Sequence, residues 1–310
     1  MIKEKIVYIT HYDLDAAGCA IVVNKLFDVV EMKAQGYGKV SAAADFMINK
    51  YHDKIDHVVI TDLMVDRSDV INLLEAFPKV TYIDHHLQSA ELVDLTEKYP
   101  GYDYYYNHKL SATALTYKYF IDNGGTPTPA LNQLVEYTNS YDLWKCTKPA
   151  FKHGCRLNNI FWNLNLWRFI ERFEDGYFGL TDDEKTFCSE QEHFIVEVIK
   201  EADIEYSNNC ALYIIKDPIA INFIPLTDNK ADVFFILSKR DDNWSCSTRL
   251  RPAAYDKYDL NEIWQKVNHP IIESAGGHKA AAGVTIKDGT DLDDIIGCLD
   301  GLIDKGYFNG

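Results

Sequence analysis

Short apolar segments rich in β-branched residues alternate with segments of helical spacing through the first third of the chain. Apolar strands that alternate with helices form a mostly parallel sheet with both faces covered. We therefore predict an α/β fold with a doubly wound N-terminal sheet, and a helix capped by Ser41 that runs to about Lys50. The expected strands are residues 6–9, 29–33, 58–60 and 80–83, with helical spacing in residues 16–27 and 71–77.

The pattern changes twice further along the chain. From Trp144 to about Ala202 the spacing is helical, and after residue 208 strand-like segments return. We predict a helical connector and then a smaller α/β C-terminal domain with a mixed sheet, including a hairpin turn at residues 241–243. The expected domains are residues 1–145, 146–205 and 206–310. The expected C-terminal strands are residues 211–216, 220–223, 233–239 and 244–250, with helices at 259–267 and 291–305.

Composition limits the classes of function. The 310 residues suggest about two domains, and an apolar content of 47% suits a packed globular protein. The 31 Lys and Arg residues stand against 47 Asp and Glu residues, which gives a formal net charge of −16. Such a surface repels phosphate at long range, so we expect no binding to long duplex DNA. A local basic pocket for a short phosphorylated ligand remains open.

Seven cysteines without a C-x-x-C pair favour reduced thiols over a disulfide framework. No stretch approaches the roughly 18–20 apolar residues of a membrane span. The first ten residues contain a four-residue apolar run and lack the features of a signal peptide. We therefore expect a cytoplasmic protein that does not bind membranes.

Acidic and imidazole side chains follow several of these apolar segments. The carboxyl ends of parallel strands face one crevice, so groups about 130 residues apart in sequence can meet there. A single Asp after a strand is usually a cap or turn residue, whereas an ordered series of them indicates a site. The series comprises His11, Asp13, Asp15, Asp62, Asp84, His85, His86 and Asp142.

Clustered carboxylates repel one another, and cations placed among them relieve that repulsion. Asp13, Asp15, Asp62 and Asp142 carry a formal charge of −4, which two divalent ions would balance. Imidazole together with carboxylate suits Mn, Fe, Co or Zn, while carboxylate and water alone suit Mg. Two metals that share Asp62 and a water would make that water a nucleophile near neutral pH. Such a site is suited to attack on phosphorus.

This ordered series resembles the DHH phosphoesterase family, which is named for its Asp-His-His triplet. The opening H-x-D-x-D-x-x-G ends at Gly18, and residues 276–283 (GGHKAAAG) resemble the G-G-H-x-x-A-A-G signature of the family's associated C-terminal domain. Both motifs stand in family order, so the likeness covers nearly the whole chain. Within the family, the compact length and the His-x-Asp-Leu-Asp opening are similar to the nanoRNase (Nrn-type) oligoribonucleases.

The resemblance implies a role for each motif residue. One Mn²⁺ ion would be held by His11, Asp13 and Asp62, and a second by Asp15, Asp62, His85 and Asp142, with Mg²⁺ or Co²⁺ as substitutes. His86 would face the scissile phosphate or its leaving oxygen, and Asp84 would orient a ligand histidine. Gly18 would permit close approach as its helix begins. Ala16 and Ala17 depart from the family pattern, where many relatives have glycine or a further polar residue.

The C-terminal motif is suited to contacts with phosphate. Gly276 and Gly277 let the backbone approach an anion, and His278 adds a donor. The resemblance implies that this loop holds the phosphates or terminal nucleotide of the substrate. Arg249 and Arg251 match the basic strand of the family and could contact phosphate in a bidentate manner, Arg249 being the stronger candidate. Lys239, Arg240 and Lys279 would extend the positive charge.

The resemblance implies an Mn-dependent phosphodiesterase that releases nucleoside monophosphates from short oligonucleotides or linear dinucleotides held between the two domains. Alternatives with the same metal site are a phosphatase acting on 3'-phosphoadenosine 5'-phosphate and a cyclic-dinucleotide phosphodiesterase. A RecJ-like exonuclease and an inorganic pyrophosphatase are disfavoured. A catalytically silent nucleotide sensor is the alternative of a different class. A homodimer remains open.

Overall fold

The computed structural model describes residues 3–36, 39–240 and 243–308, with only the backbone of Arg240. By compactness the chain separates into Met1–Thr181 and Asp182–Gly310, which we call the N-terminal and C-terminal units. The C-terminal unit thus includes helix α9 (Asp182–Lys200), which the sequence pattern assigns to the connector. The domain limits expected from the sequence stay a prediction.

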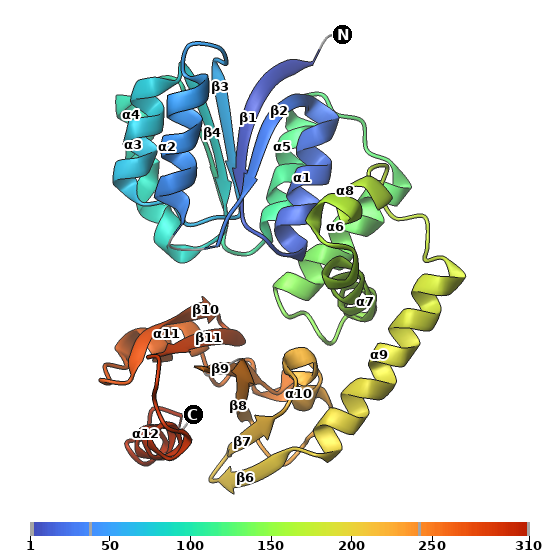
Figure 1. The fold of residues 1–310 in the computed structure, drawn as a ribbon, viewed down its shortest axis with the longest axis vertical. Coiled ribbons are helices and arrows are strands. Elements are labelled where there is room, and N and C mark those ends of the chain that lie inside the picture. Colours follow the sequence, from blue (N-terminus) through green and yellow to red (C-terminus); the bar gives the residue numbers. More distant parts are fainter. Residues whose placement is uncertain (1–2, 37–38, 241–242, 309–310) are drawn as a thin grey trace. The chain divides into compact units, whose positions relative to one another are not determined.

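A five-stranded parallel sheet forms the centre of the N-terminal unit (Figure 1). Its order is β2-β1-β3-β4-β5, and every neighbouring pair is parallel. The chain builds outward in one direction from β1 to β2 and in the other from β3 to β5. Ligands bind beside such a reversal, at the carboxyl ends of the strands. The strands are β1 (Glu4–Thr10), β2 (Phe27–Ala34), β3 (His57–Thr61), β4 (Lys79–Asp84) and β5 (Tyr102–Tyr106).

Helices cover both faces of this sheet, with α2 and α3 on one side and α1 and α5 on the other (Figure 1). Every residue of β3 is buried, as expected for a central parallel strand between two helical layers. Met47, Leu73 and Val80 belong to the apolar cluster beneath α2 and α3. The elements are α1 (Leu14–Leu26), α2 (Val40–Tyr51), α3 (Arg67–Ala76), the 3₁₀ segment η1 (Leu87–Asp94), α4 (Leu95–Lys98) and α5 (Ala112–Asp122).

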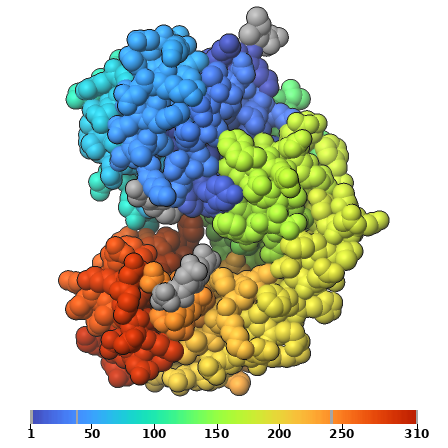
Figure 2. Space-filling model, in the orientation of Figure 1, coloured from blue at the N-terminus to red at the C-terminus, as the bar shows by residue number. Residues whose placement is uncertain are grey.

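Three further helices complete the N-terminal unit. They are α6 (Pro129–Asp142), α7 (Pro149–Leu164) and α8 (Leu166–Arg172), and all three contact α1. In the space-filling view the green-yellow residues of this region lie directly against the blue N-terminal layers (Figure 2). The helices therefore form one body with the sheet, and they place the end of α6 beside the first βα loop.

A six-stranded mixed sheet forms the C-terminal unit, in the order β10-β11-β9-β8-β7-β6. Only the β7–β8 pair is parallel within the described residues. The strands are β6 (Asp203–Ser207), β7 (Cys210–Ile215), β8 (Val233–Arg240), β9 (Asn243–Leu250), β10 (Ile272–His278) and β11 (Ala281–Ile286). The remaining elements are η2 (Pro218–Ala220), α10 (Ile224–Thr227), η3 (Pro252–Ala254), α11 (Leu260–Lys266) and α12 (Leu292–Asp304).

The predicted fold class is confirmed, with a parallel doubly wound sheet first and a mixed sheet second. The prediction of a strand at residues 220–223 is wrong. Short helical turns form on either side of this segment, because Pro218 and Pro225 restrict the backbone. The sequence pattern did not predict β5, because its residues (YDYYY) show little alternation between apolar and polar side chains. Of the expected hairpin turn, residues 241 and 242 lie outside the described residues.

The expected cap at Ser41 is also wrong. Helix α2 begins at Val40, so Ser41 lies in its first turn, and its hydroxyl donates to Asp69 Oδ2 at 2.6 Å. The side chain therefore joins α2 to α3 instead of satisfying a helix end. Among the described helices, none is long and apolar enough to cross a bilayer. None of the seven cysteines, which all lie in the described ranges, forms a disulfide.

Candidate metal centre

The predicted site residues of the N-terminal unit meet at one end of its sheet. His11 directly follows β1, Asp62 directly follows β3, and Asp84 is the last residue of β4. Asp142 is the last residue of α6, which packs on α1. The strand order reverses between β1 and β3, so the first two positions flank the point where such sheets bind ligands.

The loop after β1 is held by Asp13, which caps helix α1. Asp13 Oδ1 accepts a hydrogen bond from the Ala16 amide at 2.9 Å, and Oδ2 lies 2.8 Å from His11 Nδ1. Burial acts to raise the pKa of Asp13, but the hydrogen bond and charge of His11 and the Ala16 amide outweigh it and lower this pKa to about 2. Asp13 therefore stays ionised and close to the imidazole.

Asp62 is buried and has a left-handed backbone, with φ of 53°. Its Oδ1 lies 3.3 Å from His85 Nε2, and its buried Oδ2 has no hydrogen-bond partner among the described residues. Burial raises the pKa of Asp62 well above its usual value, and the charges of Asp13 and Asp15 raise it further. A buried carboxylate in this environment is stabilised by a cation.

Two groups of metal-ligating atoms share Asp62. The first comprises His11, Asp13 and Asp62, and within each group the donor atoms lie within 4.8 Å of one another. This first set is the one that the resemblance implies for one ion. The second group comprises Asp62, Asp84, His85 and His86.

The second group differs from the set of Asp15, Asp62, His85 and Asp142 implied by the resemblance, although those residues are close. His85 Nε2 lies 3.9 Å from Asp15 Oδ2, and His85 Nδ1 lies 3.6 Å from Asp142 Oδ2. Burial raises the pKa of Asp142 well above its usual value, and the charges of Asp15 and Asp13 add to this effect.

Asp15 has a second task in the fold. Its Oδ2 accepts a hydrogen bond from the Ala112 amide at 2.7 Å, and its Oδ1 accepts one from the Thr113 amide at 3.0 Å. These amides belong to the first turn of α5, where backbone N–H groups lack partners within the helix. Burial raises the pKa of Asp15, while the charge of His85 lowers it. Asp15 thus anchors α5 beside the metal centre.

Asp84 holds His86. Asp84 Oδ1 lies 2.8 Å from His86 Nδ1, and its Oδ2 accepts a hydrogen bond from the Ser89 hydroxyl. Tyr82 also contacts Ser89 at 2.9 Å and fixes it from the strand side. Burial acts to raise the pKa of Asp84, but the charge of His86 and its hydrogen bond lower it. The sequence did not point to Tyr82 or Ser89, since a single hydroxyl beside a motif carries no distinctive pattern.

Known proteins share sequence with parts of this chain. The DHHA1 domain family matches residues 218–305. Oligoribonuclease NrnB of Bacillus subtilis (strain 168) is 32% identical over 196 residues, which are 59% of this chain and 49% of that protein. The chain is similar to the DHH phosphoesterases. It spans about half the length of this curated relative.

Solved structures with low sequence identity share the fold. One is a DHH domain described as belonging to a family of ribosomal proteins, with a TM-score of 0.61, 15% identity, and coverage of 97% of this chain and 86% of that chain. Another is the pGpG-specific phosphodiesterase PggH from Vibrio cholerae, with a TM-score of 0.56, 14% identity, and coverage of 98% and 99%. The fold of this chain is therefore shared with these two structures.

Within the region that matches DHHA1, the two arginines differ in their surroundings. Arg251 forms an ion pair with Asp232, which also pairs with Lys257 at 2.8 Å. Arg251 lies just beyond β9 and is thus held by a local charge network. Arg249 lies on β9, and its Nε donates to Asn222 Oδ1 at 3.1 Å. Arg249 thus contacts a neutral amide, whereas Arg251 contacts a carboxylate.

The DHHA1 glycine motif is the end of a strand and not a loop, which corrects the sequence-based expectation. Gly276, Gly277 and His278 pair with Gly283, Ala282 and Ala281 of β11. The φ of Gly277 is 150°, and a Cβ at this position would lie 2.5 Å from the Ala281 carbonyl oxygen. Only glycine fits this ladder position, so Gly277 has a structural reason, whereas a Cβ at Gly276 would meet no atom within 4 Å among the described residues.

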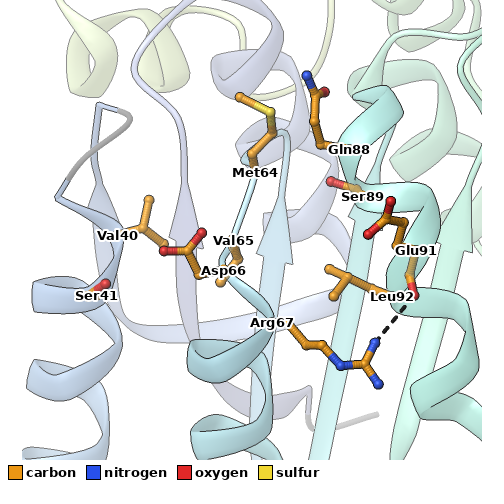
Figure 3. Close-up of a pocket in the computed structure, with 10 residues that line it drawn as sticks. All are labelled: Val40, Ser41, Met64, Val65, Asp66, Arg67, Gln88, Ser89, Glu91 and Leu92. Atoms are coloured by element: carbon orange, nitrogen blue, oxygen red, sulfur yellow. Dashed lines mark hydrogen bonds between the residues drawn. The ribbon is translucent and has the colours of Figure 1, made fainter. Parts of the chain in front are cut away.

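A cavity of about 480 Å³ is lined by residues of α2, the loop after β3, the start of α3 and η1 (Figure 3). Ser89 connects this cavity to Asp84 through its hydroxyl. Arg67 at the cavity wall makes a bidentate pair with Asp94 at 2.7 Å, so its charge is already offset. The lining residues are Val40, Ser41, Met64, Val65, Asp66, Arg67, Gln88, Ser89, Glu91 and Leu92. With two carboxylates in its lining, the cavity is poorly suited to phosphate.

Proposed function

We propose that the protein is a divalent-metal-dependent phosphodiesterase that cleaves short oligonucleotides or linear dinucleotides to nucleoside monophosphates. The observation that carries this proposal is the shared position of Asp62 in two groups of ligating side chains. Asp62 is buried, and its Oδ2 has no hydrogen-bond partner in the part of the chain that the structure describes, so this carboxylate suits a ligand shared by two ions. The similarity to an oligoribonuclease supports short nucleic acid as the substrate class.

The donor set fits two divalent ions. We propose that His11, Asp13 and Asp62 hold one, and that Asp62 and His85 hold the other with Asp15 and Asp142 close by. Imidazole with carboxylate favours Mn²⁺ over Mg²⁺. Bound ions would supply an activated water and positive charge for the phosphate.

The protein's own residues supply orientation. Asp84 engages His86 Nδ1, so Nε2 is the ring nitrogen that can face the scissile phosphate or its leaving oxygen. Ser89 and Tyr82 hold Asp84 in turn, which fixes the ring of His86. In the DHHA1 region we propose Arg249, with Gly276, Gly277 and His278, as contacts for the far end of the substrate.

A substrate-length series tests this proposal. Purified protein is incubated with RNA of 2 to about 20 nucleotides in Mn²⁺, Mg²⁺, Co²⁺ or chelator, and the products are separated by chromatography. We expect mononucleotides from the shortest substrates in Mn²⁺ and no release in chelator. Preferred turnover of 3'-phosphoadenosine 5'-phosphate or of a cyclic dinucleotide would instead establish one of the alternative enzymes. Tight binding without turnover would establish a nucleotide sensor.

The variant Asp62→Asn tests the metal mechanism. Asparagine tolerates a left-handed backbone and keeps the size of the side chain, so the change removes chiefly the charge. We expect a loss of Mn²⁺-dependent dinucleotide cleavage of about 100-fold or more, because both ions would lose a ligand. Asp66→Asn, four residues along the same loop and exposed, is the matched control and should retain activity. Full activity in Asp62→Asn would contradict the two-metal mechanism.

A further inference from the structure

An exposed aromatic pair adjoins the metal centre. Tyr12 lies in the loop between His11 and Asp13, and 38% of its surface is exposed. Trp162 near the end of α7 is 61% exposed, and its ring centroid lies 6.1 Å from that of Tyr12, with 50° between the planes. Two large rings from segments 150 residues apart thus meet at the surface beside the first group of metal-ligating atoms.

Phe161 supports this pair from beneath. It is fully buried, and its ring centroid lies 5.7 Å from Tyr12 and 5.1 Å from Trp162 in edge-on contacts. Tyr12 is therefore held by core packing at the same time as it belongs to the metal-binding loop. The packing limits the movement of both rings, so they form a preorganised surface.

Exposed aromatic surface is unfavourable in water, at about 25 cal/mol for each Å². Isolated exposed side chains need no explanation, but a supported pair beside a candidate active site does. Base–aromatic stacking contributes about 1–3 kcal/mol for each base and tolerates any sequence, since every base has a π-face. A nucleobase therefore matches the chemistry of this surface.

Cations near Asp142 suit the phosphates that accompany such a base. Burial lowers the pKa of Lys145, and the charges of Asp142 and Lys148 also act on it, so these groups lie near one another. Lys148 immediately precedes α7, the helix that carries Trp162, and Lys152 is exposed on its first turns. In a chain with a net charge of −16, these lysines add local positive charge at the start of the helix that carries Trp162.

We propose that Tyr12 and Trp162 form a stacking platform for one nucleobase of the substrate, placed beside the metal centre by the His11–Asp13 loop. This proposal rests on the proposed function and deepens it. The platform would bind any base and so would favour substrates by size and phosphate position over base identity. It would also distinguish a nucleotide from a simple phosphate ester that lacks a ring to stack.

Steady-state kinetics of Trp162→Ala test the platform. The substrates are a linear diadenylate and two analogues that lack the base at one position or the other. We expect KM for diadenylate to rise about 5- to 150-fold, the equivalent of ~1–3 kcal/mol, with kcat little changed. One of the two abasic analogues should show no difference between the variant and the original protein. Trp162→Phe should recover most of the affinity, because phenylalanine keeps a stacking ring.

Trp167→Ala is the matched control. Trp167 on α8 is similarly exposed, at 57%, and no ring contact joins it to Tyr12 among the described residues. We expect it to leave both kinetic constants unchanged. An equal loss in Trp162→Ala on all three substrates would mean that Trp162 acts through the fold, and the proposal would be overturned.

Two other results separate the proposals. If the original protein cleaves diadenylate and Trp162→Ala behaves like Trp167→Ala, the platform is wrong and the phosphodiesterase stands. If the original protein cleaves no oligonucleotide with any divalent metal, the proposed function itself is wrong. Sedimentation provides a further check: a change of oligomeric state in Trp162→Ala with an unchanged KM would assign the surface to a contact between copies, which overturns the platform.

Discussion

Asp62 combines three properties that are each unfavourable for a carboxylate. It is buried, its backbone is left-handed, and the charges of Asp13 and Asp15 raise its pKa. Strain of this kind costs on the order of 1–3 kcal/mol and persists where the surrounding structure enforces it. The amide of Asp62 donates to the Ile83 carbonyl at 3.1 Å, which ties the strained residue to the adjacent strand. Part of the unfavourable free energy of the site is therefore localised at a single residue, Asp62.

His57 provides a test at the same scale, and it lies at the opposite end of β3 from Asp62. Its side chain is fully buried, with Nε2 2.8 Å from Thr81 Oγ1 and Nδ1 3.1 Å from Glu4 Oε1. Burial lowers the pKa of His57 from 6.5 to about 3, and the charge of Lys79 contributes. The folded protein therefore keeps His57 neutral between pH 6.5 and 3, while the unfolded chain takes up a proton.

The free energy of unfolding should accordingly fall as the pH falls through 6.5, by up to about 1.4 kcal/mol for each pH unit from this residue. His57→Gln removes the titrating group and leaves a hydrogen-bonding side chain. Urea unfolding at pH 7.5 and 5.0 should show that the original protein loses about 2 kcal/mol more than the variant. Equal losses in both proteins would show that His57 is protonated in the folded state.

At the scale of elements, the pairing of α1 with α5 supports the metal centre. Asp15 near the start of α1 accepts two amides from the first turn of α5. Three residues later, Gly18 lets the two helices approach so closely that a Cβ would lie 2.2 Å from Thr113 Oγ1. The glycine of the H-x-D-x-D-x-x-G motif is thus required by packing against the helix that Asp15 anchors.

Gly18→Ala should therefore destabilise the N-terminal unit by about 1–3 kcal/mol, as overpacking does in a close contact. Chemical denaturation followed by tryptophan fluorescence measures this change. Thr113→Ala in the same chain removes the atoms that a new methyl group would meet, so the double variant should recover part of the loss. If Gly18→Ala were neutral, the helices could separate freely and the contact would not determine their spacing.

At the scale of the whole molecule, the buried carboxylates link metal binding to stability. A ligand that binds only the folded state stabilises it by about 2.7 kcal/mol when present at 100 times its Kd. Since the proposed ligands all lie in the N-terminal unit, added Mn²⁺ should raise the melting temperature of that unit.

Asp62→Asn should show the opposite pattern in a thermal scan. In chelator it should melt higher than the original protein, because it removes a buried carboxylate whose pKa burial and neighbouring charges raise. With Mn²⁺ it should gain little, whereas Asp66→Asn should gain as much as the original protein. The same Mn²⁺-induced shift in Asp62→Asn would indicate that cations bind elsewhere on this acidic chain.

The fold class follows from the amino-acid sequence, since apolar segments of strand length between helical segments admit few other architectures. The sequence also indicated which acidic and imidazole residues to examine, because they follow strands whose carboxyl ends meet. The sequence did not reveal β5. It also led to the prediction of a strand at residues 220–223, although Pro218 and Pro225 on either side disfavour a strand. The prediction of a cap at Ser41 was also wrong, because a serine that caps a helix and a serine that joins two helices look alike in sequence.

The role of each of these side chains depends on the packing of the folded chain. The two hydrogen bonds to Asp15 and the approach of Trp162 to Tyr12 join segments that helices and strands bring together from separate parts of the chain. Local patterns in a sequence record which residues are apolar or charged. They do not record to which of two carboxylate oxygens a distant amide will donate a hydrogen bond, because that depends on how the layers pack.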